Sequence, residues 1–165
     1  VAKACHEGTM PNYRRLYVPG GTYFFTVALK DRRSHLLTDE IANLRAAYGK
    51  VARTWPFETL AICVLPDHLH CVWTLPEGDS NFSTRWRLIK LNFSKSLPKD
   101  RDPAKGRRPA ERGIWQRRFW EHVVRDEDDL DACVTYVHWN PVKHGLVTEI
   151  ADWPYSSWHR NAPGL

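Results

Sequence analysis

Two apolar segments separated by a two-residue turn constrain the fold of this chain most strongly. Residues 57–65 and 68–75 are rich in β-branched, aliphatic and aromatic side chains, and Pro66-Asp67 stands between them. This pattern predicts two strands paired as an antiparallel hairpin. A further strand is predicted over 22–30, where TYFFTVALK follows the turn-forming pair Gly20-Gly21.

Two helices are predicted from apolar residues that recur every three or four positions. The first begins near Thr38 and ends before Pro56, and the second is capped by Asp79 or Ser80. Their apolar stripes are Ile41, Leu44, Tyr48, Val51 and Trp55 for the first, and Phe82, Trp86, Ile89, Phe93 and Leu97 for the second. One face of each helix should therefore pack on the strands.

A short fourth strand and a third helix complete the predicted pattern. The strand is expected over 119–125, and acidic residues at 126–129 favour the start of a helix. This helix should end near Trp139, because Asn140 precedes Pro141 and a residue before proline is disfavoured in the α region. The order β-α-β-β-α-β-α predicts an α+β fold: a ferredoxin-like split βαβ unit with a central antiparallel sheet and an added C-terminal helix. The residues after that helix are expected to form an irregular tail.

Several protein classes are excluded by the composition. The longest apolar run, at 60–65, is far shorter than the roughly 20 residues that span a bilayer. No basic stretch followed by an apolar segment opens the chain, so no signal peptide is expected. The four cysteines have neither CxxC spacing nor the density of a disulfide framework, which favours a reducing, cytoplasmic location.

Positive charge is concentrated in one part of the chain. The whole sequence carries +5, but residues 85–125 hold thirteen Lys or Arg against four acids, a local balance of +9. Trp86, Trp115 and Trp120 lie in the same region. Interleaved cations and aromatic rings are typical of a groove for single-stranded nucleic acid, where phosphates pair and bases stack. The alternative is a solvated face joined to a basic loop at 98–113, which is expected to be mobile.

His68 and His70 are the first candidates for chemistry. They occupy positions i and i+2 of a predicted strand, so both imidazoles should face one side while Leu69 faces the other. Two neighbouring imidazoles suit a divalent ion. The alternatives are two half-exposed strand histidines, or a zinc site that uses Cys63 or Cys71, although Cys71 falls on the Leu69 face.

Tyr136 and Asn140 are the second candidates, because positions i and i+4 share one helix face. The Asn140 amide oxygen could be a third metal ligand, with Tyr136 one turn away. Alternatively, the tyrosine packs in the core and the asparagine caps the helix. With the histidine pair and the basic region, the set favours attack by a tyrosine on a DNA phosphodiester, assisted by a metal ion.

The sequence resembles the REP-associated tyrosine transposases, single-domain relatives of the IS200/IS605 transposases in the HUH endonuclease superfamily. The segments that carry the resemblance are YRR at 13–15, GGTYFFTV at 20–27, LPDHLHCVW at 65–73, IWQRRFWEH at 114–122, NPVKHG at 140–145 and WPYSS at 153–157. The resemblance implies one HUH-type domain over 10–165. Residues 1–9 are interpreted as a tag or upstream extension, because Met10 is the only methionine.

The resemblance also implies a function. His68 and His70 match the metal pair, Tyr136 matches the catalytic tyrosine that forms a covalent 5′-phosphotyrosine, and Asn140 stands where relatives often have Gln. The implied ion is Mg²⁺ or Mn²⁺, and the implied substrate is single-stranded DNA carrying repetitive extragenic palindrome (REP) hairpins. Candidate DNA contacts are Tyr13, Arg14, Arg15, Arg87, Lys90, Trp115, Arg117, Arg118 and Trp120.

Two rival functions and one structural alternative stay open at this point. A non-catalytic protein that binds hairpins or single strands would need the basic region but no nucleophile. A hydrolase of small phosphoesters would need the metal but not the basic region. A monomer is favoured over a dimer that exchanges its last helix.

Overall fold

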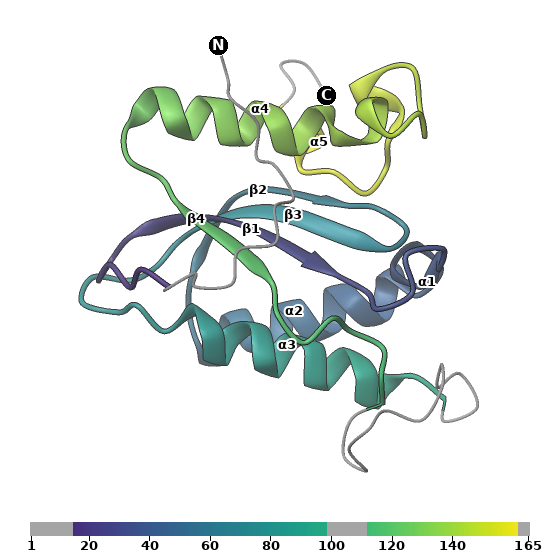
Figure 1. Cartoon of the computed structure of the whole chain (residues 1–165), viewed down its shortest axis with the longest axis horizontal. Helices are drawn as coiled ribbons and strands as arrows, with labels where there is room; N and C mark the ends of the chain where they lie inside the picture. The colour runs from purple at the N-terminus through teal and green to yellow at the C-terminus, as the bar shows by residue number, and fades with distance from the viewer. Residues whose placement is uncertain (1–14, 99–111, 162–165) are drawn as a thin grey trace.

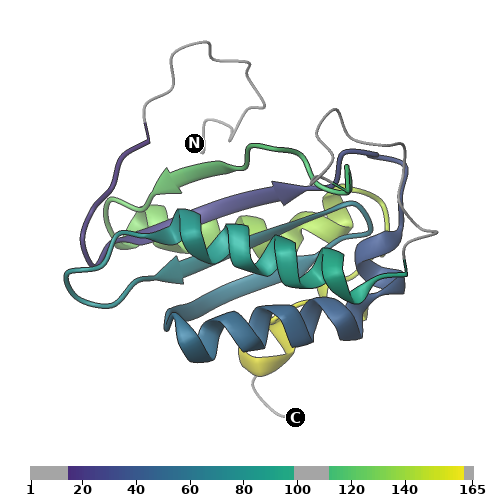
Figure 2. The ribbon, with the colours of Figure 1, turned by 90° about the horizontal axis from the view of Figure 1, so that it is seen from below.

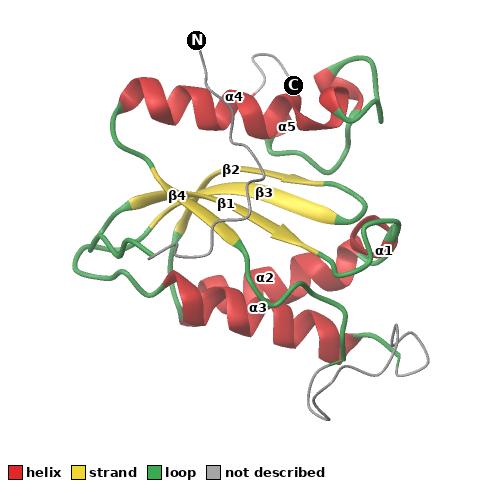
Figure 3. Cartoon of the chain, in the orientation of Figure 1, coloured by secondary structure: helices red, strands yellow, loops and turns green. Residues whose placement is uncertain are grey.

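The computed structural model describes residues 15–98 and 112–161, which form three layers (Figure 1). A four-stranded sheet lies in the middle, with α2 and α3 on one face and α4 on the other (Figure 3). The elements are β1 (Thr22–Ala28), α1 (Leu36–Asp39), α2 (Ile41–Thr54), β2 (Glu58–Val64), β3 (His68–Thr74), α3 (Phe82–Ser96), β4 (Trp120–Val123), α4 (Glu127–Lys143), η2 (Ile150–Asp152) and α5 (Trp158–Asn161).

The sheet has the strand order β2-β3-β1-β4, and every neighbouring pair is antiparallel. The hairpin of β2 and β3 is confirmed, and so are the α+β class and the ferredoxin-like arrangement with an added helix. Figure 2, seen from below, shows α2 and α3 running side by side in front of the sheet. Each central strand therefore has one face toward the α2–α3 pair and one toward α4.

Side-chain alternation along the strands builds a separate core on each face of the sheet. Phe25 on β1 and Trp73 on β3 belong to the core shared with α2 and α3, where the rings of Trp73 and Trp86 stack with centroids 4.3 Å apart. Phe24 and Val72, their chain neighbours, belong to a smaller core beneath α4. The five apolar residues predicted for the α3 stripe are all buried in the larger core.

The predicted end of the last helix is wrong, because α4 continues through Pro141 to Lys143. Proline removes one N–H donor, and so near a helix end it leaves only one carbonyl without its usual partner. The last turn is closed by the N–H of His144, which donates to Asn140 O at 3.0 Å, and the chain leaves the helix at Gly145, whose φ is +68°. The longer helix therefore ends at Lys143, with His144 as its C-cap residue.

Smaller differences concern helix starts. The helix predicted from Thr38 is divided at Glu40 into α1 and α2. The cap of α3 is Asn81, whose side chain accepts from Thr84 N at 3.1 Å, while Asp79 pairs with Arg85 instead. Residues 1–9 and most of the loop predicted at 98–113 lie outside the described residues.

The tail after α4 is not irregular throughout, because it contains η2 and α5 and returns to the edge of β2. Val64 N donates to Tyr155 O at 2.9 Å, and Ser157 N donates to Ile62 O at 2.8 Å. Trp153 donates its indole N–H to Val64 O at 2.9 Å. Backbone groups of the tail thus satisfy the outer edge of β2. No helix in the described part is both long and apolar enough to cross a membrane.

Candidate active site

His68 and His70 lie side by side on the face of β3 that α4 covers, as the alternation predicted. Their ring centroids are 4.9 Å apart and both residues are only 4% exposed. Leu69, between them, is buried in the opposite core. The strand thus directs both imidazoles toward one point beneath the helix.

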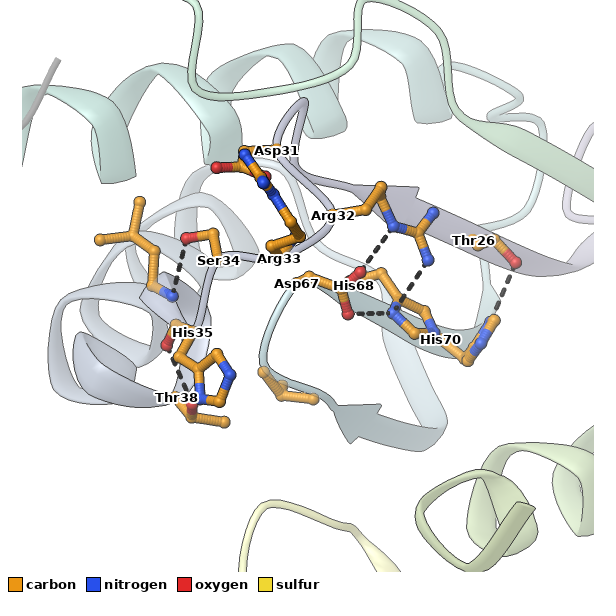
Figure 4. A network of polar contacts seen from close by, with 12 residues as sticks. Thr26, Asp31, Arg32, Arg33, Ser34, His35, Thr38, Asp67, His68 and His70 are labelled. Carbon is orange, nitrogen blue, oxygen red and sulfur yellow. Dashed lines mark hydrogen bonds and ion pairs between the residues drawn. The ribbon is translucent and has the colours of Figure 1, made fainter. Parts of the chain in front are cut away.

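The Nδ1 atom of each histidine has a partner that orients the ring (Figure 4). His68 Nδ1 lies 2.7 Å from Asp67 Oδ1, and His70 Nδ1 lies 2.9 Å from Thr26 Oγ1. Arg32 Nε donates to the other Asp67 oxygen at 2.5 Å. When Nδ1 carries the proton, the lone pair of Nε2 is available to a metal ion, which is how second-shell partners set up histidine ligands.

Both histidines are held in the neutral form that binds metals. Burial lowers the pKa of His68, although Asp67 acts in the opposite direction. Burial lowers the pKa of His70 well below its ordinary value, and the nearby positive charge of Lys143 contributes to the same shift. Neutral imidazole is the ligand form, so the pair can accept a cation without first losing protons.

One face of α4 lies over the histidine pair. The Tyr136 ring is 5.3 Å from the His70 ring, and the His144 ring is 5.1 Å from the His68 ring, measured between centroids. Asn140 is one helical turn from each of Tyr136 and His144, so it lies between them on this face. The structure therefore brings together the four residues predicted to perform the chemistry.

Asn140 is wholly buried, and its side-chain oxygen fits a metal ligand. Its Nδ2 atom donates to Tyr136 O at 3.4 Å, whereas Oδ1 has no hydrogen-bond partner within the described part of the chain. A buried amide oxygen without a partner is costly unless something satisfies it. Two imidazoles and one amide oxygen form a donor set that suits Mg²⁺ or Mn²⁺ when water and phosphate oxygens complete the shell.

Sequence reasoning missed Lys143 and His144, which also reach this site. Lys143 Nζ lies 3.4 Å from Tyr136 Oη and 4.7 Å from the centre of its ring. Both residues follow Pro141, beyond the predicted end of the helix. Lys143 is seven residues after Tyr136 and His144 is four residues after Asn140, and both separations place residues on one helix face. A helix predicted to continue past Pro141 would therefore have identified both residues as members of the site.

Other tyrosines are poorly placed to react at the histidines. The Tyr48 hydroxyl bonds to Thr59 Oγ1 and to the indole N–H of Trp73, each at 2.6 Å, and burial raises the pKa of this phenol well above its usual value. Burial also raises the pKa of Tyr23, whose hydroxyl donates to the Val18 carbonyl. Both lie on the α2–α3 side of the sheet.

The structure does not favour the zinc alternative. Cys71 lies in the core opposite the histidines, and burial raises the pKa of Cys63 to about 12, which disfavours the thiolate that zinc requires. A different group, His122, Asp129 and Cys133, has its ligand atoms within 4.8 Å of one another. However, one Asp129 oxygen already accepts from His122 Nε2, from Arg125 N and from Arg125 Nε. These bonds join β4 to the first turn of α4.

The predicted DNA-binding residues fall into two groups on opposite sides of the sheet. Arg15, Arg87, Lys90, Trp115 and Arg117 line a groove of about 640 Å³ between α3 and residues 112–119. Trp120 lies on the other face, where its ring meets Phe24 edge-on at 5.7 Å and is 38% exposed. Arg118 is exposed and does not line the groove, and Tyr13 and Arg14 lie outside the described residues.

Lys90 is a partly buried cation of the groove. Its ammonium donates to Gln116 O at 3.0 Å and lies over the rings of Phe119 and Trp115, at 5.5 and 5.8 Å. Burial, with a contribution from Arg15, lowers the pKa of Lys90 to about 8. Cations and aromatic rings therefore share one surface, as a single-strand groove requires.

Not every cation of the basic region is available to a polyanion. Arg85 is 1% exposed, and it donates to the carbonyls of Trp55, Pro56 and Asn81 as well as to Asp79. Arg112 likewise donates to the carbonyls of Ser94, Leu97 and Pro98 at the end of α3. These two arginines close chain turns and contribute to stability.

Comparison with known proteins gives consistent results. A family model described as "Transposase IS200 like" matches residues 18–140. A protein of Haemophilus influenzae named as a REP-associated tyrosine transposase is 51% identical over 154 residues, which cover 92% of this chain and 88% of that protein. The REP-associated tyrosine transposase of Escherichia coli K12 is 50% identical over 157 residues, covering 94% and 88%.

One solved structure is similar over most of the chain. It is a REP-associated tyrosine transposase bound to a REP hairpin, with a TM-score of 0.81 and 50% sequence identity. The match covers 92% of this chain and 84% of that one.

Proposed function

This chain belongs to the IS200-like transposase family, as one of its REP-associated tyrosine transposases, and from that premise we propose that it cleaves and rejoins single-stranded DNA at REP hairpins through Tyr136. The observation that carries the proposal is the position of α4. This helix sets the Tyr136 ring 5.3 Å from the His70 ring, and one turn further along it carries Asn140, whose buried side-chain oxygen has no hydrogen-bond partner among the described residues.

The proposed metal ligands are His68, His70 and Asn140. Asp67 and Thr26 fix the two imidazoles with their Nε2 atoms toward the site, and burial keeps both rings neutral. The chemistry that a bound Mg²⁺ or Mn²⁺ would supply is neutralisation of the negative charge that grows on the scissile phosphate. Orientation of the ligands is therefore the contribution of β3 and its neighbours.

In the proposed reaction, Tyr136 Oη forms a bond to phosphorus and the bond from phosphorus to the 3′ oxygen breaks. The phenol proton leaves to water, and the departing 3′ oxygen takes a proton from water. The product is a 5′-phosphotyrosine and a free 3′ hydroxyl. The covalent bond conserves the phosphodiester energy, so a 3′ hydroxyl can attack the intermediate and rejoin a strand.

The proposed DNA-binding surface joins the two groups of predicted contacts around β4. The groove on the α3 side offers cations and rings to one stretch of single strand. Trp120 lies on the α4 side of β4. Its ring contacts Phe24, and the Phe24 ring contacts Tyr136. We infer that a REP hairpin places its single-stranded flank along this path, because stacking on these rings needs unpaired bases.

Mass spectrometry after incubation with REP hairpin DNA and Mn²⁺ tests the proposal. The wild-type protein should carry a covalent nucleotide adduct on Tyr136, and Tyr136→Phe should bind the hairpin normally without forming one. Tyr155→Phe is the matched control, because Tyr155 lies by the β2 edge, away from the histidines. His68→Ala and His70→Ala should each abolish cleavage while leaving hairpin affinity nearly intact.

Three results would contradict the proposal. Hairpin binding without an adduct would identify a non-catalytic binding protein. An adduct on another residue would show that Tyr136 is not the nucleophile. Cleavage by His68→Ala or His70→Ala at the wild-type rate would show that the histidine pair does not hold the metal ion.

A further inference from the structure

We propose that Lys143 is a second catalytic residue, whose ammonium group stabilises negative charge on Tyr136 Oη as the bond to phosphorus forms. The inference rests on the proposed role of Tyr136 and adds a group to the same site. Lys143 Nζ donates toward Tyr136 Oη at 3.4 Å, so it touches the reacting atom itself.

The path of α4 explains why this contact exists. Residues seven apart are separated by two helical turns and share one face, so a helix that ended at Asn140 would leave Lys143 off the Tyr136 face. Because α4 continues through Pro141, Lys143 is its last residue and returns over the tyrosine ring, 4.7 Å from the centroid. The helix end also favours a cation, since the last carbonyls carry partial negative charge.

The charge of Lys143 is directed at the site and is not neutralised by a carboxylate. The ion pairs in the described ranges do not include Lys143. Lys143 lies over the Tyr136 ring, and that ring is 5.3 Å from the His70 ring, so the ammonium group is near the histidine pair. A scissile phosphate that lies between the histidines and Tyr136 would therefore also meet this ammonium group.

The proposed role is electrostatic and does not move the lysine proton. The phenol proton leaves to water, as described above. When Oη carries partial negative charge, a donor at hydrogen-bonding distance stabilises it, as donors do in an oxyanion hole. In the rejoining reaction the phenolate is the leaving group and meets the same donor. Cleavage and its reversal share one transition state, so the loss of Lys143 should slow both cleavage and rejoining.

A structural role makes a different prediction. If Lys143 only packs on the Tyr136 ring, its removal should change thermal stability or hairpin affinity, and the rate of the bound complex should stay the same. Arginine keeps the charge and can restore the donor, whereas glutamine keeps polarity without charge. The pair Lys143→Gln and Lys143→Arg therefore separates charge from packing.

The test is single-turnover kinetics with saturating REP hairpin DNA and Mn²⁺. Lys143→Gln should slow formation of the Tyr136 adduct by roughly 10²-fold, the lower range for loss of one such donor. Rejoining from the isolated adduct should also slow, while hairpin and Mn²⁺ affinities stay near wild type. Lys143→Arg should recover most of the rate. Lys50→Gln, an equal charge change on exposed α2, should behave as wild type.

Each alternative outcome would overturn the inference. Adduct formation by Lys143→Gln at the wild-type rate would remove Lys143 from the reaction and leave the Tyr136 proposal standing. A loss confined to hairpin affinity would make Lys143 a DNA contact only, and rejoining at the wild-type rate would exclude stabilisation of the shared transition state relative to the adduct. If the wild-type protein forms no adduct on Tyr136, the proposed function fails and the role of Lys143 fails with it.

Discussion

Replacing Asp67 with asparagine should weaken metal binding at the histidine pair by about 10- to 100-fold, or roughly 1.4–2.8 kcal/mol. Asp67 Oδ1 lies 2.7 Å from His68 Nδ1, and Oδ2 accepts from Arg32 Nε. Asparagine preserves the shape of the side chain but removes the negative charge that faces His68 and Arg32. Outer-shell carboxylates typically change metal affinity by this factor when they orient a histidine ligand.

The neighbourhood of Asp67 favours the upper part of that range. Arg32 Nη2 also lies 3.4 Å from His68 Nδ1, so without the carboxylate an uncompensated guanidinium faces the ligand. Protonation of His68 cannot account for the loss, because Asp67 raises the pKa of His68 and its removal lowers that pKa further. The asparagine variant should therefore keep a neutral imidazole to lower pH and still bind metal more weakly.

Titration with Mn²⁺, followed by electron paramagnetic resonance or calorimetry at pH 7.5, measures the effect directly. Asp31→Asn is the matched control, because Asp31 pairs with Arg33, whose side chain is 93% exposed, and does not contact the histidines. Thr26→Val removes the Nδ1 partner of His70 and should weaken binding in the same direction. If Asp67→Asn binds Mn²⁺ within about twofold of wild type, the carboxylate does not orient a ligand and the reasoning fails.

The remaining predictions concern DNA binding and stability. Affinity for single-stranded DNA should fall as pH rises through about 8, because Lys90 loses its charge near that pH; Lys90→Arg should bind evenly from pH 7 to 9, and an equal decline in both proteins would exclude Lys90 as the cause. Five cations of the groove other than Arg112 can meet phosphate, so log K should fall against log salt with a slope of roughly −3.5, at about −0.7 per phosphate, and a slope near zero would refute this surface. Arg85→Met should lower the free energy of unfolding in urea by about 3 kcal/mol, because it leaves buried carbonyls unpaired, whereas exposed Arg87→Met should change it little.

The fold was predictable because its determinants are local. Apolar runs predict the β2 and β3 strands, successive side chains of a strand alternate between its two faces, and a period near 3.6 in α3 predicts which side chains of that helix are buried. The same alternation placed His68 and His70 on the face opposite Leu69, which the structure confirms geometrically. One rule about strands therefore accounts for both the packing and the position of the histidine pair.

The C-terminal end of the site was not predictable from local rules. The residue before a proline disfavours the α region, and this correctly describes the preference of Asn140 in isolation. Within the fold, α4 packs on β2 and β3, and Asn140 and Pro141 are both buried, so tertiary contacts outweigh the local preference. The sequence rule removed the turn that brings Lys143 to the Tyr136 ring and His144 to the His68 ring.

The grouping of the DNA contacts was also hidden from the sequence. Trp115, Arg117, Arg118 and Trp120 are close in the chain and suggest one patch. Successive residues of a strand face opposite sides, so Phe119 points to the α3 groove while Trp120 points to the α4 side. A count of charges in the sequence has a similar limit, because it does not show which cations are exposed. Arg87 is exposed, whereas Arg85 is buried and donates to backbone carbonyls.

The two edges of the sheet are treated differently, and this difference links the fold to the proposed function. Residues 155–157 bond along the outer edge of β2 and close it. At the other edge, β4 has only four residues and pairs only with β1 among the described strands. The groove lies on one side of β4 and the Tyr136 site on the other. A DNA strand that reaches both must therefore cross this edge of the sheet. A rigid duplex cannot bend around a single β-strand at modest cost, because its persistence length is about 150 base pairs. For the proposed path, we therefore expect a single strand to bind better than a duplex, independently of base stacking.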